Sequence, residues 1–161
     1  MSEQNQEAQQ PVFAIQKLYV KDASLEVPNA PFVFAEEQQP EFNIQFRNNA
    51  RQVSAENGFY EGSLTVTAEA KVEDRNVFLV EVTQAGLFQI ENVPEAEMDP
   101  LLGIGVPSIL FPYLRETISD LTTRAGFPPL LLQPINFEAI YLQQRAQQAA
   151  QQTEANAQTT H

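Results

Sequence analysis

The strongest constraint on the fold is the alternation of apolar and polar side chains in residues 59–73. The apolar residues of this segment share one face, and they are Leu64, Val66, Ala68, Ala70 and Val72. The polar residues share the other face, and they are Ser63, Thr65, Thr67, Glu69, Lys71 and Glu73. A period of two residues is typical of a β-strand with one buried face. Asp74 and Arg75 predict a tight turn into a second strand over residues 76–91, which a short hairpin makes antiparallel to the first.

The strand predicted at residues 76–91 is apolar on both faces. One face carries Phe78, Val80, Val82, Phe88 and Ile90, and the other still carries Val77, Leu79 and Leu87. A sheet that faces water on one side shows hydrophobic-in, polar-out alternation instead. We therefore expect helices of the same chain to cover one face and a second chain to cover the other. The alternative is a strand buried centrally within one subunit.

Two more strands are expected upstream, over residues 12–27 and 41–53. The first is rich in β-branched and aromatic residues, and the second carries Phe42, Ile44 and Phe46 at a period of two. The three prolines of residues 28–40 predict an extended loop between them. This loop also holds Phe32, Val33 and Phe34, so part of it must pack on another element.

The remainder of the chain has helical patterns. From Ser108 onward a single apolar stripe predicts a helix, and its members are Leu110, Leu114, Ile118 and Leu121. Gly126 and Pro128-Pro129 stop this helix, and Asn136 is a good N-cap for the next one. Beyond Leu142 the sequence is mainly Gln and Ala without an apolar stripe, so this second helix is expected to fray into a polar tail.

Strands that precede helices predict an α+β fold, with a four-stranded antiparallel sheet and two helices packed on one face. The expected organisation is a disordered N-terminal segment at residues 1–11, one domain at residues 12–142, and a frayed helix end with a disordered Gln/Ala-rich tail at residues 143–161.

The composition argues against an enzyme. The chain has no cysteine, which removes disulfides, thiolate nucleophiles and cysteine-based metal sites. Its only histidine is His161, the last residue, so Ser–His chemistry has no placed base. No glycine-rich phosphate loop is present, and only acid–base work by paired carboxylates stays open. We expect no cofactor and no metal.

The formal net charge is −12, from 21 acidic and 9 basic residues. Such a surface repels nucleic acid and anionic membranes, and it suits either plain solubility or a partner with a basic face. No apolar run approaches the length of a membrane span, and the polar N-terminus is unlike a signal peptide. The chain is therefore expected to stay in the cytoplasm without membrane insertion.

Four segments, in order and with matching spacing, resemble the signatures of the SecB protein-export chaperone family. They are LYVKDASLEVPNAP at 18–31, VFLVEVTQAGLFQI at 77–90, LFPYLRETI at 110–118 and FPPLLLQPINFEAI at 127–140. The resemblance covers roughly residues 12–142. Two departures stand out: Gln38 replaces a frequent Trp of the loop, and Asp99-Pro100-Leu101 replaces a frequent Ala-His-Cys.

The resemblance implies a molecular chaperone of the Sec protein-export pathway. Members of the family form a homotetramer, a dimer of dimers. They bind unfolded secretory preproteins in long hydrophobic grooves, keep them competent for translocation and deliver them to the SecA motor, without a nucleotide or metal of their own.

The resemblance also assigns residues. SecA binding would fall on Asp22, Glu26, Leu79 and Glu81, which otherwise form a solvated acidic face. Assembly would involve Val80, Val82 and Gln84, which otherwise are core residues. Preprotein binding would involve Phe42, Ile44 and Phe46. The apolar loop residues Phe32, Val33 and Phe34 are further groove candidates, because aromatic residues in a loop have little structural reason to exist. The opposite wall would be Leu101, Leu102 and Ile104.

Two other functions stay open. One is a SecB-like chaperone that serves a different client, such as an antitoxin, although Asp22, Glu26 and Glu81 favour SecA. The other is an unrelated acidic ligand-binding domain, which predicts a monomer with one closed pocket.

Overall fold

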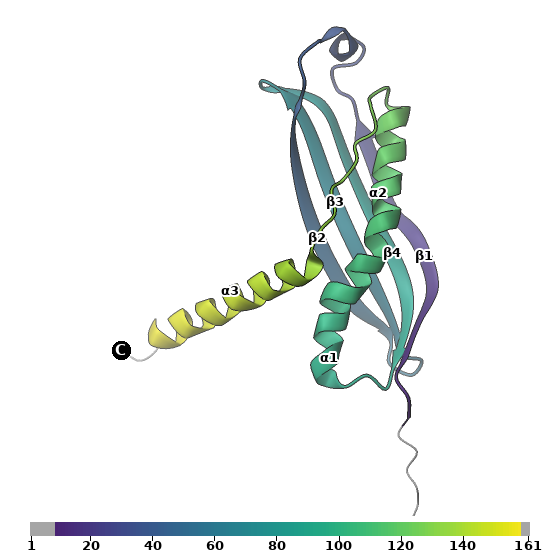
Figure 1. Cartoon of the computed structure of the whole chain (residues 1–161), viewed down its shortest axis with the longest axis vertical. Coiled ribbons are helices and arrows are strands. Elements are labelled where there is room, and N and C mark those ends of the chain that lie inside the picture. Colours follow the sequence, from purple (N-terminus) through teal and green to yellow (C-terminus); the bar gives the residue numbers. More distant parts are fainter. Residues whose placement is uncertain (1–8, 159–161) are drawn as a thin grey trace, which may run out of the picture.

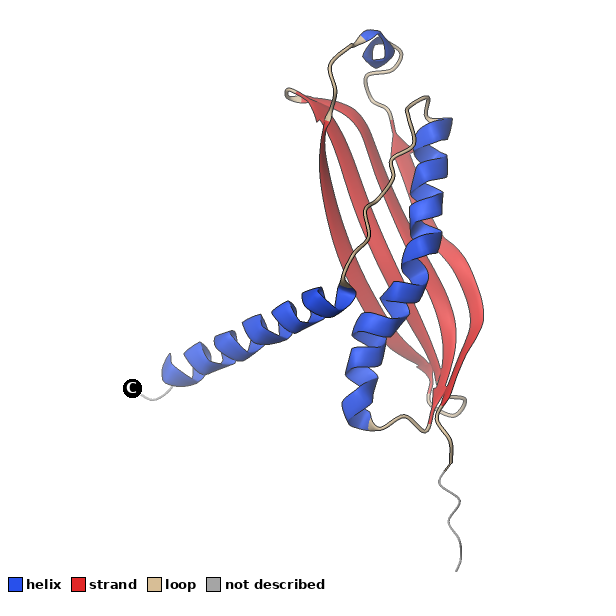
Figure 2. Cartoon of the chain, in the orientation of Figure 1, coloured by secondary structure: helices blue, strands red, loops and turns tan. Residues whose placement is uncertain are grey.

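The computed structural model describes residues 9–158, in which four long strands form one antiparallel sheet. The strands are β1 (Val12–Glu26), β2 (Glu41–Ser54), β3 (Phe59–Val72) and β4 (Arg75–Glu91), and their order across the sheet is β1-β4-β3-β2 (Figures 1 and 2). The predicted fold class is confirmed. The hairpin turn falls at Glu73-Asp74, one residue earlier than expected, with Glu73 at a φ of 55°. β4 lies in the interior of the sheet, in agreement with the alternative of a strand buried centrally within one subunit.

A bent helical stretch follows the sheet and lies along one of its faces. It consists of α1 (Glu95–Pro100), a π-helical segment (Leu101–Gly105) and α2 (Val106–Arg124), joined end to end. The helical turns therefore begin well before Ser108, with Pro100 and Pro107 accommodated at the junctions. None of the helices within residues 9–158 has both the length and the apolar character that crossing a membrane requires.

The last helix, α3 (Phe137–Gln158), projects away from the body of the molecule instead of lying on the sheet (Figure 1). It also continues to Gln158, whereas the sequence predicts that the helix frays beyond Leu142. Ala, Gln and Arg are good helix formers, so local propensity sustains the turns without an apolar stripe. Of the predicted disordered ends, residues 1–8 and 159–161 lie outside the described residues.

The core lies between α2 and the sheet. Its fully buried members from the helix include Leu110, Leu114 and Ile118, which pack with buried strand residues including Leu64, Val66, Val80, Val82 and Phe88. Gly62 permits a close approach, because a Cβ at this position would lie 2.3 Å from Cγ1 of Val106. The start of α2 can therefore rest directly on β3.

The other face of the sheet is left open by the helices that the structure describes (Figure 1). Along β4, the side chains that alternate with the buried ones are mostly half-buried, and they include Leu79, Glu81, Thr83 and Leu87. The sheet thus presents one apolar face to α2 and one mainly polar face to its surroundings, which we call the open face.

Candidate functional site

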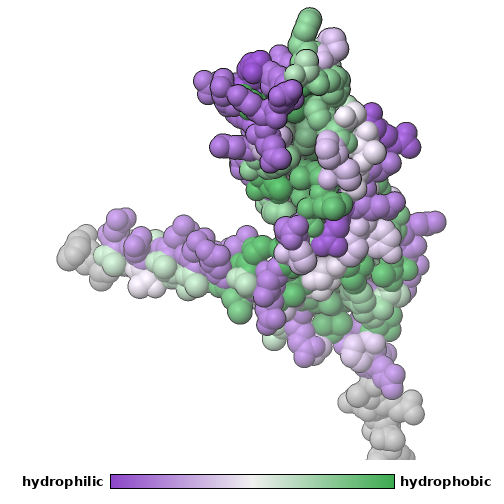
Figure 3. All heavy atoms as spheres, turned by 45° about the horizontal axis from the view of Figure 1, so that its top comes forward, coloured by the Kyte–Doolittle hydropathy of each residue, from purple (hydrophilic) through white to green (hydrophobic). Residues whose placement is uncertain are grey.

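A groove of about 490 Å³ opens at the end of the sheet where β2, β3 and β4 meet two loops. One wall is the short 3-10 helix Phe32–Ala35, and the other is the segment that follows α2. The aromatic and aliphatic residues that line it, prolines aside, are Val33, Phe34, Phe42, Val72, Val77, Phe78, Phe127 and Leu130. Figure 3, which brings this end forward, shows hydrophobic residues gathered here beside a group of hydrophilic ones.

Four aromatic rings connect the walls of the groove to its floor. The ring centroids of Phe34 and Phe127 are 5.2 Å apart, those of Phe127 and Phe78 are 5.1 Å apart, and those of Phe78 and Phe42 are 6.2 Å apart. Phe34 is still 50% exposed and Phe42 49% exposed. Half-exposed rings held in place by their neighbours offer preformed apolar surface to a ligand.

Backbone geometry admits the Phe34 ring to this cluster. Gly126 has a φ of 95°, and a Cβ at this position would lie 3.0 Å from Cε1 of Phe34. A residue other than glycine would therefore be strained and crowded here. Gly126, which ends α2, therefore also shapes one wall of the groove.

The structure brings together some of the predicted preprotein-binding residues and separates others. Val33, Phe34 and Phe42 line the groove, and Ile44 and Phe46 continue from it along β2 on the same face. Phe32 is 80% exposed and is not part of the groove lining.

Leu101, Leu102 and Ile104 do not form the opposite wall of this groove. They lie in the π-helical segment, half-buried against the core, near the middle of β2, where Asn48 donates a hydrogen bond to the Leu102 carbonyl. The opposite wall is instead built by Phe127 and Leu130, which sequence reasoning missed. Phe127 could have been found from the sequence, because it is an aromatic loop residue between Gly126 and two prolines. The same argument selected Phe32–Phe34.

The groove offers apolar surface and amides rather than acid–base machinery. Among the described residues that line it, Glu36 alone is ionisable, and it is paired with Arg75. Gln38 and Gln39 add polar amides to the lining. Within residues 9–158, no group of three or more acidic or histidine side chains converges to hold a metal ion.

The four predicted SecA-binding residues lie together on the open face. Ser24 is opposite Glu81 and Glu26 is opposite Leu79 across the β1–β4 pair, so Asp22 and Glu26 flank Glu81 diagonally. Asp22 and Glu26 are exposed, and Glu81 accepts a hydrogen bond of 2.8 Å from the Thr67 hydroxyl. We call Asp22, Glu26, Leu79 and Glu81 the acidic patch.

A β-bulge decides which face of the sheet carries these carboxylates. The register between β1 and β4 shifts between Val20 and Asp22. Without the extra residue, strict alternation from Tyr19 would turn Asp22 and Glu26 toward α2. The bulge turns them to the open face and leaves Ala23 and Leu25 facing the helix.

Val80, Val82 and Gln84 lie on the face that α2 covers, and they are 0%, 0% and 3% exposed in the single chain. Side chains buried inside one chain present no surface to a second chain. An effect of these residues on assembly stays a prediction, and it would have to pass through the position of α2.

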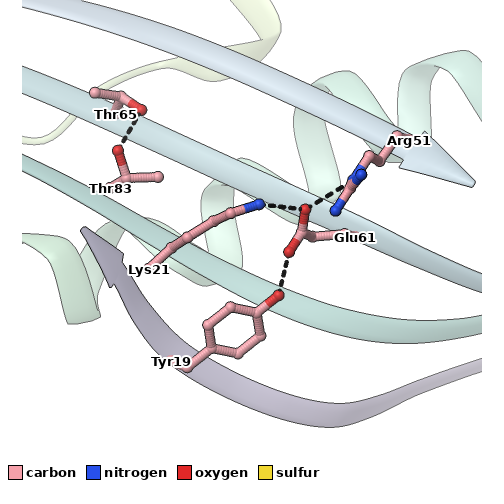
Figure 4. A network of polar contacts seen from close by, with 6 residues as sticks. All are labelled: Tyr19, Lys21, Arg51, Glu61, Thr65 and Thr83. Carbon is pink, nitrogen blue, oxygen red and sulfur yellow. Dashed lines mark hydrogen bonds and ion pairs between the residues drawn. The ribbon is translucent and has the colours of Figure 1, made fainter. Parts of the chain in front are cut away.

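A partly buried carboxylate connects three strands on the open face (Figure 4). Glu61 of β3 accepts hydrogen bonds from Tyr19 and Lys21 of β1 and from Arg51 of β2, with the Lys21 nitrogen at 2.7 Å and the Arg51 nitrogen at 3.0 Å. The Lys21 and Tyr19 hydrogen bonds lower the pKa of Glu61 to about 2. Burial and the bond to Glu61 raise the pKa of Tyr19 to about 12.

We expect Glu61→Gln to destabilise the chain by about 1 kcal/mol at neutral pH, since Lys21 and Arg51 are exposed and solvent screens their pairs with Glu61. A lowered folded-state pKa contributes stability above the ordinary value of 4.5 and loses it as the pH falls toward about 2. The difference between wild type and variant should therefore shrink over this interval in urea unfolding. Glu56→Gln, in the exposed turn after β2, is the control, and a pH-independent difference would contradict the prediction.

Comparison with known proteins identifies close relatives. The family model for "Preprotein translocase subunit SecB" matches residues 6–148. A "Protein-export protein SecB" of Chromobacterium violaceum is 58% identical over 149 residues, covering 92% of this chain and 97% of the relative. A protein of the same name from Thiobacillus denitrificans is 56% identical over 155 residues, covering 96% and 99%.

Among solved structures, a Mycobacterium tuberculosis SecB-like chaperone in complex with an antitoxin peptide has a similar fold. The TM-score is 0.64 at 20% sequence identity, and the match covers 76% of this chain and 90% of that one. At this identity the likeness concerns the fold alone.

Proposed function

Because the chain belongs to the SecB family and is a chaperone of protein export, we propose that it holds non-native preproteins in its aromatic groove and delivers them to SecA. The observation that carries the proposal is a preformed, half-exposed cluster of phenylalanine rings that is open to solvent.

The groove suits cargo without a fixed sequence. Burial of apolar side chains is non-directional and requires no particular sequence in the ligand. The row of Phe42, Ile44 and Phe46 leads from the groove along β2, an edge strand whose outer backbone groups are available to an extended chain. Phe34 and Phe127 supply aromatic surface beside Gln38, where the family often has Trp.

Delivery would use the opposite side of the molecule. The groove and the β2 row belong to the face that α2 covers, whereas the acidic patch belongs to the open face. SecA is expected to dock its basic zinc-binding tail on this patch. Cargo and SecA can therefore be bound at the same time.

We further propose a homotetramer, a dimer of dimers. An uncovered row of apolar residues supports it: Phe13, Ile15 and Val20 of β1 are exposed on the face that α2 only partly covers. β1 is also an edge strand with free backbone groups, and such edges pair readily with another chain.

Two further properties complete the proposal. The chaperone works in the cytoplasm, where preproteins are made, and it has no catalytic activity of its own. Export is favoured over an antitoxin client because the export relatives are 52–58% identical, whereas the antitoxin-binding structure is 20% identical.

We expect Phe34→Ala combined with Phe42→Ala to weaken the capture of an unfolded preprotein by about 30-fold, since each ring contributes on the order of 1 kcal/mol of burial to the ligand. The measurement is the retardation of preprotein refolding at increasing chaperone concentration, at low and high salt. Apolar binding should be insensitive to salt. Phe32→Ala, outside the groove lining, is the matched control. Equal losses for the control and the double variant would move the binding site out of the groove.

A further inference from the structure

The open face carries a second charged region beside the acidic patch. Five of the nine Lys and Arg residues of the chain lie on it. Lys71 is beside the acidic patch and is paired with Glu69. The other four are Lys17, Lys21, Arg47 and Arg51, and we call them the cationic region.

Strand register places the cationic region next to the acidic patch on one surface. Lys17 is opposite Leu87, Leu87 is opposite Glu61, and Glu61 is opposite Arg51, so these residues form one row across the sheet. Arg47 belongs to a second row, opposite Thr65, which is opposite Thr83 of β4. Along β4, Glu81 lies six residues, about 20 Å, from Leu87 in the Lys17 row, and two residues, about 7 Å, from Thr83 in the Arg47 row.

Internal pairing neutralises only part of the cationic region. Glu61 binds both Lys21 and Arg51 (Figure 4). Lys17 and Arg47 are exposed, and neither forms an ion pair with another residue in the described part of the chain. Their charges are therefore available to an external anion.

From this arrangement we propose that the open face binds one segment of a partner that carries both a basic block and an acidic block. The basic block lies on the acidic patch, and the acidic block lies on Lys17 and Arg47. The inference rests on the proposed docking of a basic partner at the acidic patch, and it adds the partner's second charge and its spacing. A purely basic segment is repelled by Lys17 and Arg47, so these residues restrict which partners fit.

The test compares the binding of three synthetic peptides to the full chain at low salt by fluorescence anisotropy. The block peptide has a run of lysines, a Gly/Ser spacer of about six residues, set by a rise of about 3.4 Å per residue, and an equal run of glutamates. The second peptide replaces the glutamates by serines. The third alternates lysine and glutamate and has the same composition as the block peptide without its spacing.

The block peptide should bind several-fold more tightly than the alternating one. Lys17→Gln with Arg47→Gln should weaken the block peptide by about fivefold, from the loss of two exposed ion pairs, and should leave the lysine–serine peptide unchanged or tighter. Arg124→Glu changes the net charge by the same amount on the distant α2 and should have no selective effect.

Equal binding of the block peptide to wild type and to the Lys17/Arg47 variant overturns the inference. The proposed docking still stands in that case if the lysine–serine peptide binds and is lost on charge reversal of the acidic patch. If no peptide responds to the acidic patch, both the docking and the inference fail.

Discussion

Val82→Asp is expected to remove most of the folding stability of the chain. Val82 is fully buried and belongs to the core cluster with Leu110, Leu114 and Ile118 of α2. An unpaired carboxylate in an apolar core costs several kcal/mol, and a domain of this size has a total stability of about 5–15 kcal/mol. We expect urea unfolding, followed by circular dichroism, to show a large drop in midpoint or no cooperative transition.

Light scattering separates this result from a defect in assembly alone. The wild type should have four times the 18.0 kDa of one chain if the tetramer proposal holds. Gln45→Asp introduces the same carboxylate on the open face of the sheet, at an exposed position, and should fold normally. A Val82→Asp chain that keeps wild-type stability but forms only dimers would mean that Val82 lies between subunits.

Val82 and Gln45 lie on opposite faces of the sheet, and the contrast between them shows how far the sequence could predict the fold. Residue composition and alternation together identified all four strands, and alternation identified the buried row of β3, because a period of two directly reports one covered face. It could not reveal that α2 covers Val80 and Val82 within one chain, since an apolar face has the same pattern whether a helix or another subunit covers it. Nor did it predict the π-helical segment, which depends on how α1 and α2 join.

The acidic patch could be predicted from the sequence more fully than the groove. Asp22 and Glu26 are four residues apart on one strand, so their shared side was predictable; which side they share depends on the bulge after Val20. The groove is assembled from three chain regions that are distant in sequence. Phe34 and Phe42 were identified from local composition, whereas Phe127 enters the site only because Gly126 turns the chain back after α2.

A functional consequence follows from the bulge. It turns the carboxylates of β1 to the open face while Leu25 still packs toward the core on the opposite side. One strand thus contributes apolar contacts to the body of the chaperone and charge to its outer surface. Under the proposed function, this separation would keep the charged docking surface away from apolar cargo in the groove, where an unpaired carboxylate would oppose apolar binding.

Reversal of three charges in the acidic patch should abolish SecA binding. In the variant Asp22→Lys, Glu26→Lys and Glu81→Lys, attraction to the basic tail is replaced by repulsion. Single exposed pairs contribute on the order of 0.2–1 kcal/mol, so the loss of three of them weakens binding by up to about 100-fold, and the added repulsion weakens it further. Isothermal titration with the isolated SecA tail measures the effect, and wild-type binding should weaken as salt rises past about 0.15 M, where the Debye length is about 8 Å.

The control reverses three exposed carboxylates elsewhere, Glu56→Lys, Glu116→Lys and Glu154→Lys, which changes the net charge equally without touching the open face. If binding depends on the patch, the control should lose only the long-range attraction of a less acidic protein, a few-fold at low salt, while cargo capture and assembly stay intact in both variants. Similar affinities of the two variants for the SecA tail would show that overall charge, rather than the arrangement of Asp22, Glu26 and Glu81 around the β1 bulge, attracts the partner.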